Sequence, residues 1–225
     1  WRAHTVATTM LTLTAAVRSH GGAQSLLRGD IAMDGLQLDQ IRVEPQIAAY
    51  RRMVRDLAFD VCELAPTTYL CAKAFNKQFT AIPVFLTRDF HHRSVVCNVA
   101  SGIKEPRDLI GKKFGVRAYT VTTGVWTRGI LESEYGVDPA QVTWYTDDEE
   151  HVTEWVPPSN VIHLPPGESL AAMIAAGRLD AALSGAAGIG RSGPPTANWE
   201  AAAAQAVAAP TATQLVPLFS NARAL

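Results

Sequence analysis

Hydroxyl side chains gather where the sequence predicts the start of a helix. In the stretch 113–131 a short apolar strand leads into a turn that holds Tyr119, Thr122 and Thr123, and we expect the helix to begin at one of the two threonines. The first N–H groups of a helix lack partners within it, so a carboxylate or phosphate can bind there without a metal ion. The alternative is an ordinary threonine N-cap on a surface helix.

Groups suited to acid–base chemistry and to carboxylate binding stand together in the stretch 87–94, between two apolar segments. The guanidinium of Arg88 can bind a carboxylate through two parallel hydrogen bonds. His91 and His92 can transfer protons near neutrality, because imidazole has an unperturbed pKa of about 6.5. The alternative for these two histidines is a purely structural hydrogen-bonding role.

Further polar residues follow other predicted strands. Ser19 and His20 come after the first strand, and Glu63 ends a third strand shortly before Thr67 and Thr68 open a helix. In α/β proteins, ligands bind at the carboxyl ends of parallel strands, beside the helix starts. We therefore expect these residues to line a ligand cleft.

The order of the predicted elements indicates an α/β fold with largely parallel sheets. Strand and helix patterns alternate through residues 1–94, which we predict to form a first lobe, and again through 95–185, a second lobe. Residues 186–225 are rich in Ala, Gly and Pro, which favours a linker with a partial return segment. The predicted elements include strands at 5–14, 37–43, 59–64 and 81–85 and an Ala-rich helix at 199–208.

Two charged segments are predicted to face solvent. Arg51, Arg52 and Arg55 lie opposite the apolar positions of an amphipathic helix pattern, which favours a solvated helix face. The acidic run 147–150 lacks the regular ligand spacing of a calcium site and is expected to be a solvated loop.

Four further side chains are given no role in ligand binding. Arg128 lies more than one turn into its predicted helix, which favours a surface or interlobe salt bridge. Trp126 is assigned to the core rather than to a stacking surface. His151 and His163 have no sequence neighbours that indicate a metal site.

Composition excludes several classes of function. The chain has 225 residues, of which 48% are hydrophobic, and a formal charge of −1, so it lacks the basic surplus of a nucleic-acid-binding domain. No apolar run approaches the roughly 20 residues that span a bilayer. The spacing of Cys62, Cys71 and Cys97 matches no zinc pattern, and we expect no metal site.

Between residues 11 and 185 the chain resembles the 4,5-dihydroxyphthalate decarboxylase family. The most specific match is YTVTTGVWTRGIL at 119–131. Shorter matches are EYGVD at 134–138, RDFHH at 88–92, DVCEL at 60–64 with Tyr69, LPPGESL at 164–170 and AGRLDA at 176–181, with an echo at 215–219. The resemblance implies the two-lobed fold of type 2 periplasmic binding proteins, with the C-terminal segment that returns to the first lobe missing here.

The resemblance also implies a function: cofactor-independent decarboxylation of a hydroxylated aromatic acid, such as 4,5-dihydroxyphthalate, bound between the lobes. Catalysis is then assigned to His92, with His91 and Glu63 in support. The residues assigned to substrate binding are Arg88, Ser19, His20, Thr67, Thr68, Tyr119, Thr122 and Thr123. The expected partner is a small aromatic or organic carboxylate, without nucleic acid or membrane, and a homo-oligomer is left open. The expected location is cytoplasmic, or periplasmic if a signal peptide precedes Trp1.

Two alternatives stand beside this function. The same fold serves the solute-binding proteins of ABC transporters, which hold a small organic anion and release it unchanged. A noncatalytic variant of the decarboxylase family is the other. The chain also departs from the family pattern, because Arg117 and Ala118 stand where its members usually have Pro-Glu, and Ala65 and Pro66 replace seryl positions.

Overall fold

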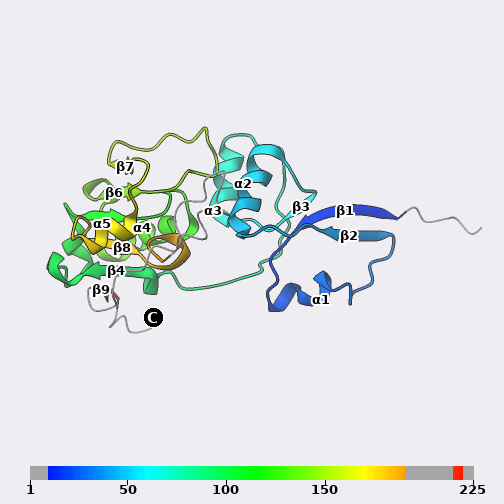
Figure 1. The fold of residues 1–225 in the computed structure, drawn as a ribbon, viewed down its shortest axis with the longest axis horizontal. Helices are drawn as coiled ribbons and strands as arrows, with labels where there is room; N and C mark the ends of the chain where they lie inside the picture. The colour runs from blue at the N-terminus through cyan, green and yellow to red at the C-terminus, as the bar shows by residue number, and fades with distance from the viewer. Residues whose placement is uncertain (1–9, 191–214, 220–225) are drawn as a thin grey trace, which may run out of the picture.

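The computed structural model describes residues 10–190 and 215–219, which form two α/β lobes (Figure 1). The first lobe, on the right of Figure 1, is built on a three-stranded sheet, and the second, on the left, on a six-stranded sheet. The predicted helix at 199–208 and the first half of the strand predicted at 5–14 lie outside the described residues. The predicted division at residues 94 and 185 stays a prediction.

The first lobe has β1 at its centre, with β2 and β3 parallel to it on either side. Its strands are β1 (Leu11–Ala16), β2 (Leu36–Gln40) and β3 (Val61–Cys62), and its helices are α1 (Gln24–Leu27), α2 (Gln46–Asp56) and α3 (Pro66–Ala74). Proline marks both main helix starts: Pro45 directly precedes α2, and Pro66 is the first residue of α3, where its missing N–H leaves no hydrogen bond unmade. Helices α2 and α3 follow the parallel strands β2 and β3, so both begin beyond the edge where the strands of this sheet end.

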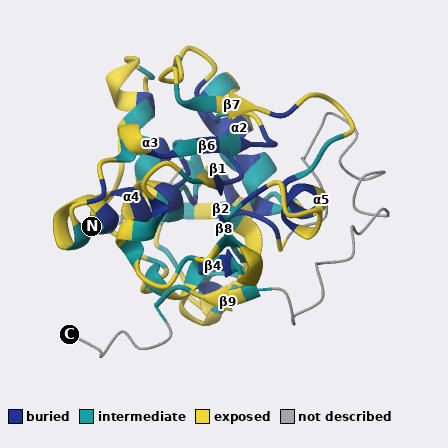
Figure 2. Ribbon diagram, turned by 90° about the vertical axis from the view of Figure 1, so that its left-hand side faces the viewer, coloured by how far each residue is buried: buried dark blue, intermediate teal, exposed yellow. Residues whose placement is uncertain are grey.

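The second lobe has strands in the spatial order β7-β6-β5-β8-β4-β9. They are β4 (Val95–Asn98), β5 (Lys113–Gly115), β6 (Thr143–Thr146), β7 (Val161–His163), β8 (Ala181–Leu183) and β9 (Leu215–Pro217), and the helices are α4 (Thr122–Tyr135) and α5 (Leu170–Ala175). Strands β5 to β8 run parallel, whereas β4 runs antiparallel to both β8 and β9. Figure 2 shows the outer strands β7 and β9 largely exposed, while the core gathers around Phe114, Leu131, Trp144 and Leu183.

Helix α4 packs closely against the sheet because a glycine faces β5. A Cβ built on Gly124 would lie 3.0 Å from a methyl group of Val116, so a larger residue would push the first turn of the helix away from the sheet. The helix ends at Gly136, whose left-handed conformation (φ 66°) is the usual helix C-cap. Both features agree with the strand–turn–helix expected from the sequence.

One predicted strand does not form. Residues 81–85 belong to neither sheet, the chain bends at Pro83, and Ile82, Val84 and Phe85 are exposed. A strand requires a neighbour that completes its backbone hydrogen bonds, and within residues 10–190 and 215–219 this segment has none. It serves instead as part of the long connection between the lobes (Figure 1).

Candidate functional site

The starts of α3 and α4 meet between the lobes, where Thr67 contacts Thr120 and Thr122. The Thr67 hydroxyl donates to the carbonyl oxygen of Thr120 at 2.8 Å, and its oxygen lies 2.9 Å from the Thr122 hydroxyl. Because the single Thr67 proton points to Thr120, the Thr122 hydroxyl is the donor in the second hydrogen bond. Helix α4 has Val121 at its N-cap and no side-chain cap, so the alternative of a threonine N-cap is wrong.

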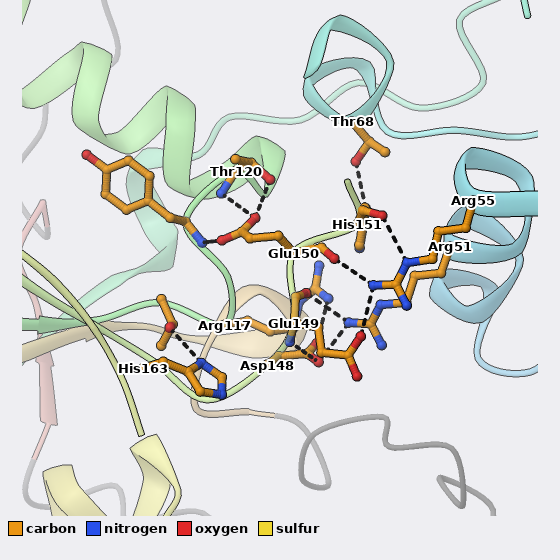
Figure 3. Close-up of polar contacts among 12 residues, drawn as sticks. Arg51, Arg55, Thr68, Arg117, Thr120, Asp148, Glu149, Glu150, His151 and His163 are labelled. Carbon is orange, nitrogen blue, oxygen red and sulfur yellow. Dashed lines mark hydrogen bonds and ion pairs between the residues drawn. The ribbon is translucent and has the colours of Figure 1, made fainter. Parts of the chain in front are cut away.

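The turn before α4 already holds a carboxylate, and it belongs to the protein itself. Glu150 accepts hydrogen bonds from the backbone N–H groups of Tyr119 (2.5 Å) and Thr120 (3.1 Å) and from the Thr120 hydroxyl (Figure 3). We call Tyr119 and Thr120 the anion-binding turn. This carboxylate is held by the two residues that precede the N-cap Val121, not by the first residues of the helix.

Arg128 lies buried behind the anion-binding turn. Its Nη2 donates to the carbonyl oxygen of Tyr119 at 2.7 Å, and its guanidinium carbon lies 3.5 Å from the centre of the Tyr119 ring. Burial lowers the pKa of Arg128, while Tyr119 and Glu150 act in the opposite direction. The predicted surface or interlobe salt bridge is wrong, because the residue is only 8% exposed and forms no ion pair with any described carboxylate.

The loop 147–155, which follows β6, joins the second lobe to the first. Asp148 lies between two guanidinium groups, 2.7 Å from Arg51 of α2 and 3.0 Å from Arg117 (Figure 3). Its side chain is 1% exposed. The predictions of a solvated acidic loop and of a solvated arginine face are therefore wrong for Asp148 and Arg51, because each charge buries itself against an opposite one.

Further contacts fix the same interlobe loop to α2 and α3. Arg55 forms an ion pair with Glu149 at 2.9 Å and donates to the carbonyl oxygens of Glu150 and His151. Lys77, just beyond α3, forms an ion pair with Glu154 at 2.5 Å. The loop therefore contacts the first lobe at several positions between residues 148 and 154.

His151, for which the sequence predicts no role, is buried at this interface. Its Nδ1 lies 2.7 Å from the Thr68 hydroxyl, and its Nε2 has no hydrogen-bond partner among the described residues. Burial, with Arg117, Arg51 and Arg55 nearby, holds the pKa of His151 well below its usual value. In the sequence, His151 directly follows an acidic run. The three arginines that lie near it in the structure are distant in the chain, so no local pattern predicts its burial.

Glu63 lies at the end of β3 in a second charged group of the first lobe. It forms an ion pair with Arg18, accepts a hydrogen bond from the Tyr50 hydroxyl at 3.2 Å, and lies 3.8 Å from Nε2 of His20. Burial opposes its ionisation, but the hydrogen bonds from Arg18 outweigh it and lower the pKa of Glu63. Ser19, beside this group, is exposed. Glu63 is thus an ion-pair partner in this structure and a weak base.

The two histidines of the connecting segment lie at the ligand-side edge of the second sheet. Val95 pairs with Leu183, the last residue of β8, so β4 starts at the edge where the parallel strands end. His91 stacks on Trp126 with ring centres 6.3 Å apart, and Trp126 follows Thr122 by one helical turn. The structure therefore brings His91 towards the first turn of α4.

His92 and Arg88, the other predicted site residues of this segment, contact aromatic side chains outside α4. The His92 ring packs edge-on against Phe219 at 5.4 Å, and exposed Arg88 lies 5.9 Å from the Phe85 ring. Trp126 is 55% exposed and stacks against His91, so the prediction that it lies in the core is wrong. Thr123 sits in the first turn of α4, partly exposed.

A pocket of about 270 Å³ opens beside the interlobe loop, lined by Asp148, Glu149 and Glu150 together with Trp155 and Pro157. Its carboxylates already pair with arginines or with the anion-binding turn, so we do not assign the pocket to an anionic ligand. In the described part of the chain no group of His, Cys, Asp and Glu side chains is arranged to hold a metal ion, and no helix is long and apolar enough to cross a membrane.

The fold places the chain among proteins built like periplasmic binding proteins. It is similar to the alkanesulfonate-binding protein SsuA from Xanthomonas axonopodis pv. citri (TM-score 0.50, 12% identity, 78% of this chain and 54% of that chain). It is also similar to the periplasmic aliphatic sulphonate binding protein SsuA from Escherichia coli (TM-score 0.51, 13% identity, 93% of this chain and 60% of that chain). At these identities the likeness concerns the two-lobed fold alone.

Sequence relatives identify the family more closely, although no model of a known protein family matches the chain. Over 181 residues it is 32% identical to 4,5-dihydroxyphthalate decarboxylase from Comamonas testosteroni and 31% identical to that from Pseudomonas putida. The chain belongs to the 4,5-dihydroxyphthalate decarboxylase family. The match takes in 77% of this chain, and it spans 54% of the Comamonas relative and 70% of the Pseudomonas one.

We predict that His151 makes the folded state less stable in mild acid. In the unfolded chain its imidazole has a pKa of about 6.5, whereas the folded pKa is much lower. Below pH ~6.5 the unfolded state therefore binds a proton that the folded state does not, so the free energy of unfolding falls as the pH drops from there towards the folded pKa. Above pH ~6.5 this histidine adds no pH dependence.

The measurement is urea unfolding of the parent and of His151→Asn at pH values of about 7.5 and 5.5. The parent should lose more stability than the variant between the two. His91, whose pKa burial also lowers, contributes equally in both proteins and cancels. The same loss in parent and variant would contradict the prediction.

Proposed function

We propose that the protein is a cofactor-independent decarboxylase that acts on a hydroxylated aromatic acid such as 4,5-dihydroxyphthalate, bound between the lobes. The observation that carries the proposal is the anion-binding turn, whose two N–H groups and hydroxyl hold the carboxylate of Glu150. Donors arranged around one carboxylate suit another of the same shape. Membership of the decarboxylase family supports the choice of an aromatic dicarboxylate.

The two carboxylates of the substrate would bind to different parts of the protein. One carboxylate would bind at the anion-binding turn, with the Thr67 and Thr122 hydroxyls beside it. Arg88, exposed in the connection between the lobes, is free of ion pairs with the described carboxylates and would bind the second carboxylate bidentately. This role requires Arg88 to turn towards the cleft.

The reaction needs proton transfer but no external electron acceptor. A base takes a phenolic proton, and the electron pair moves through the ring to the carbon that bears the leaving carboxylate. That carbon takes a proton, its bond to the carboxyl carbon breaks, CO₂ leaves, and the phenol regains its proton, so one proton is consumed in all. His92 and His91 stand at the ligand-side edge of the sheet and would carry these protons.

We predict CO₂ release when the protein is incubated with 4,5-dihydroxyphthalate, and its loss by at least about 100-fold in His92→Ala, because a positioned acid–base group contributes that much or more. Binding of the compound, measured by titration calorimetry, should largely survive. The matched control is Arg93→Ala, which removes an exposed cation one residue away that pairs with Asp89. Equal turnover in His92→Ala and the parent would remove His92 from the mechanism.

The same assay separates the proposal from transport. Tight binding of 4,5-dihydroxyphthalate or another hydroxylated aromatic acid by the parent, with no CO₂ release, would support a solute-binding protein instead. Neither binding nor release across a panel of such acids would contradict both functions.

We predict that Thr122→Val weakens binding of 4,5-dihydroxyphthalate roughly 3- to 10-fold, the usual worth of one hydrogen bond. Valine keeps the shape of threonine but removes the hydroxyl that meets Thr67 across the lobes. The control is Ser133→Ala, an exposed hydroxyl near the other end of α4. Unchanged affinity in Thr122→Val would refute a role for this hydroxyl.

A further inference from the structure

We infer that Glu150 is a built-in competitor for the anion-binding turn, so that a ligand carboxylate enters only as the Glu150 carboxylate leaves. The identity of the ligand rests on the proposed function; the competition rests on the contacts of Glu150. In the structure Glu150 uses both carboxylate oxygens, one on the N–H of Tyr119 and the other on the N–H and hydroxyl of Thr120. No residue was assigned this role from the sequence.

Two carboxylates cannot share this turn. Each backbone N–H has one proton to donate, and the contacts of 2.5 Å and 3.1 Å already use both. A second carboxylate beside the first would also be repelled by its charge, and strongly so in a part-buried site. Binding of a ligand carboxylate and retention of Glu150 are therefore alternatives.

Arg128 is an independent reason to expect an anion here. Its guanidinium is only 8% exposed, it contacts Tyr119 through both the carbonyl oxygen and the ring, and its Nη1 has no hydrogen-bond partner among the described residues. A buried cation without a directly paired carboxylate favours negative charge nearby. Glu150 supplies that charge in this structure, and a ligand carboxylate would supply it once Glu150 has moved.

Displacement of the Glu150 side chain would change the contacts that join the two lobes. Its side chain is held by the anion-binding turn of the second lobe, while its carbonyl oxygen accepts from Arg55 of the first. Trp155, at the end of the same loop, stacks on the Tyr119 ring with centres 5.5 Å apart. Release of the carboxylate therefore frees one of two attachments of a residue that joins the lobes, which couples ligand binding to the interlobe loop.

The experiment compares the parent with Glu150→Gln and with Glu149→Gln, its neighbour, whose ion pair with Arg55 is at the surface. Glutamine is nearly isosteric but neutral, so it accepts weaker hydrogen bonds at the turn. Removal of the competitor should tighten binding of 4,5-dihydroxyphthalate about tenfold, because the turn is then free in a larger fraction of molecules. Glu149→Gln should bind as the parent does.

Two further measurements keep the outcomes distinct. Hydrogen exchange at the amides of Tyr119 and Thr120 should be faster in Glu150→Gln than in the other two proteins, and circular dichroism should show all three folded. Equal or weaker ligand binding by folded Glu150→Gln would overturn the inference and leave the proposed function standing.

If 4,5-dihydroxyphthalate binds none of the three proteins, the proposed function fails and benzoate becomes the probe. Benzoate should then bind Glu150→Gln about tenfold more tightly than the parent, which would support the competition without the proposed substrate. Equal benzoate affinity in the two proteins, or no benzoate binding by any of them, would overturn the inference.

Discussion

The burial of one carboxylate, Asp148, between two guanidinium groups is the interaction on which the site depends. A carboxylate removed from water is costly unless opposite charges and hydrogen bonds replace the solvent, and Arg51 and Arg117 do so from opposite lobes. The pairing fixes the position of the interlobe loop. Because Glu150 and His151 follow Asp148 directly, it also sets where the carboxylate at the anion-binding turn and the buried imidazole lie.

The second constraint is the close packing of α4 on its sheet. Gly124 lets the first turn of the helix approach Val116, and Arg128 fills the space behind Tyr119 with a cation rather than an apolar side chain. The turn before the helix is thereby held with its N–H groups directed at the carboxylate of Glu150. The strand–turn–helix and the charged loop together place the carboxylate of Glu150 on the N–H groups of the turn.

Local patterns in the sequence were enough for much of this. The alternation of strands and helices predicted an α/β fold with helices starting beyond the strand ends, but the contact between Thr67 and Thr122, which lie beyond strands of two different sheets, was not predicted. The long YTVTTGVWTRGIL match identified the family. The predictions that failed concern contacts between distant segments. Arg51 and Asp148 are 97 residues apart, and the sequence around each predicts a solvated side chain. Periodicity reports which residues face a core but not which charges pair across lobes, so His151 and Glu150 were missed with them.

The measurement that tests this account most directly is a double-mutant cycle on Arg51 and Asp148, with Arg51→Met, Asp148→Asn and the double variant compared by urea unfolding. If the buried pair joins the lobes, each single change should cost about 3–5 kcal/mol. The double variant should then lose less than the sum of the two by about 0.5–3 kcal/mol. Losses that add to within about 0.3 kcal/mol would contradict the account, because the two groups would then be energetically independent.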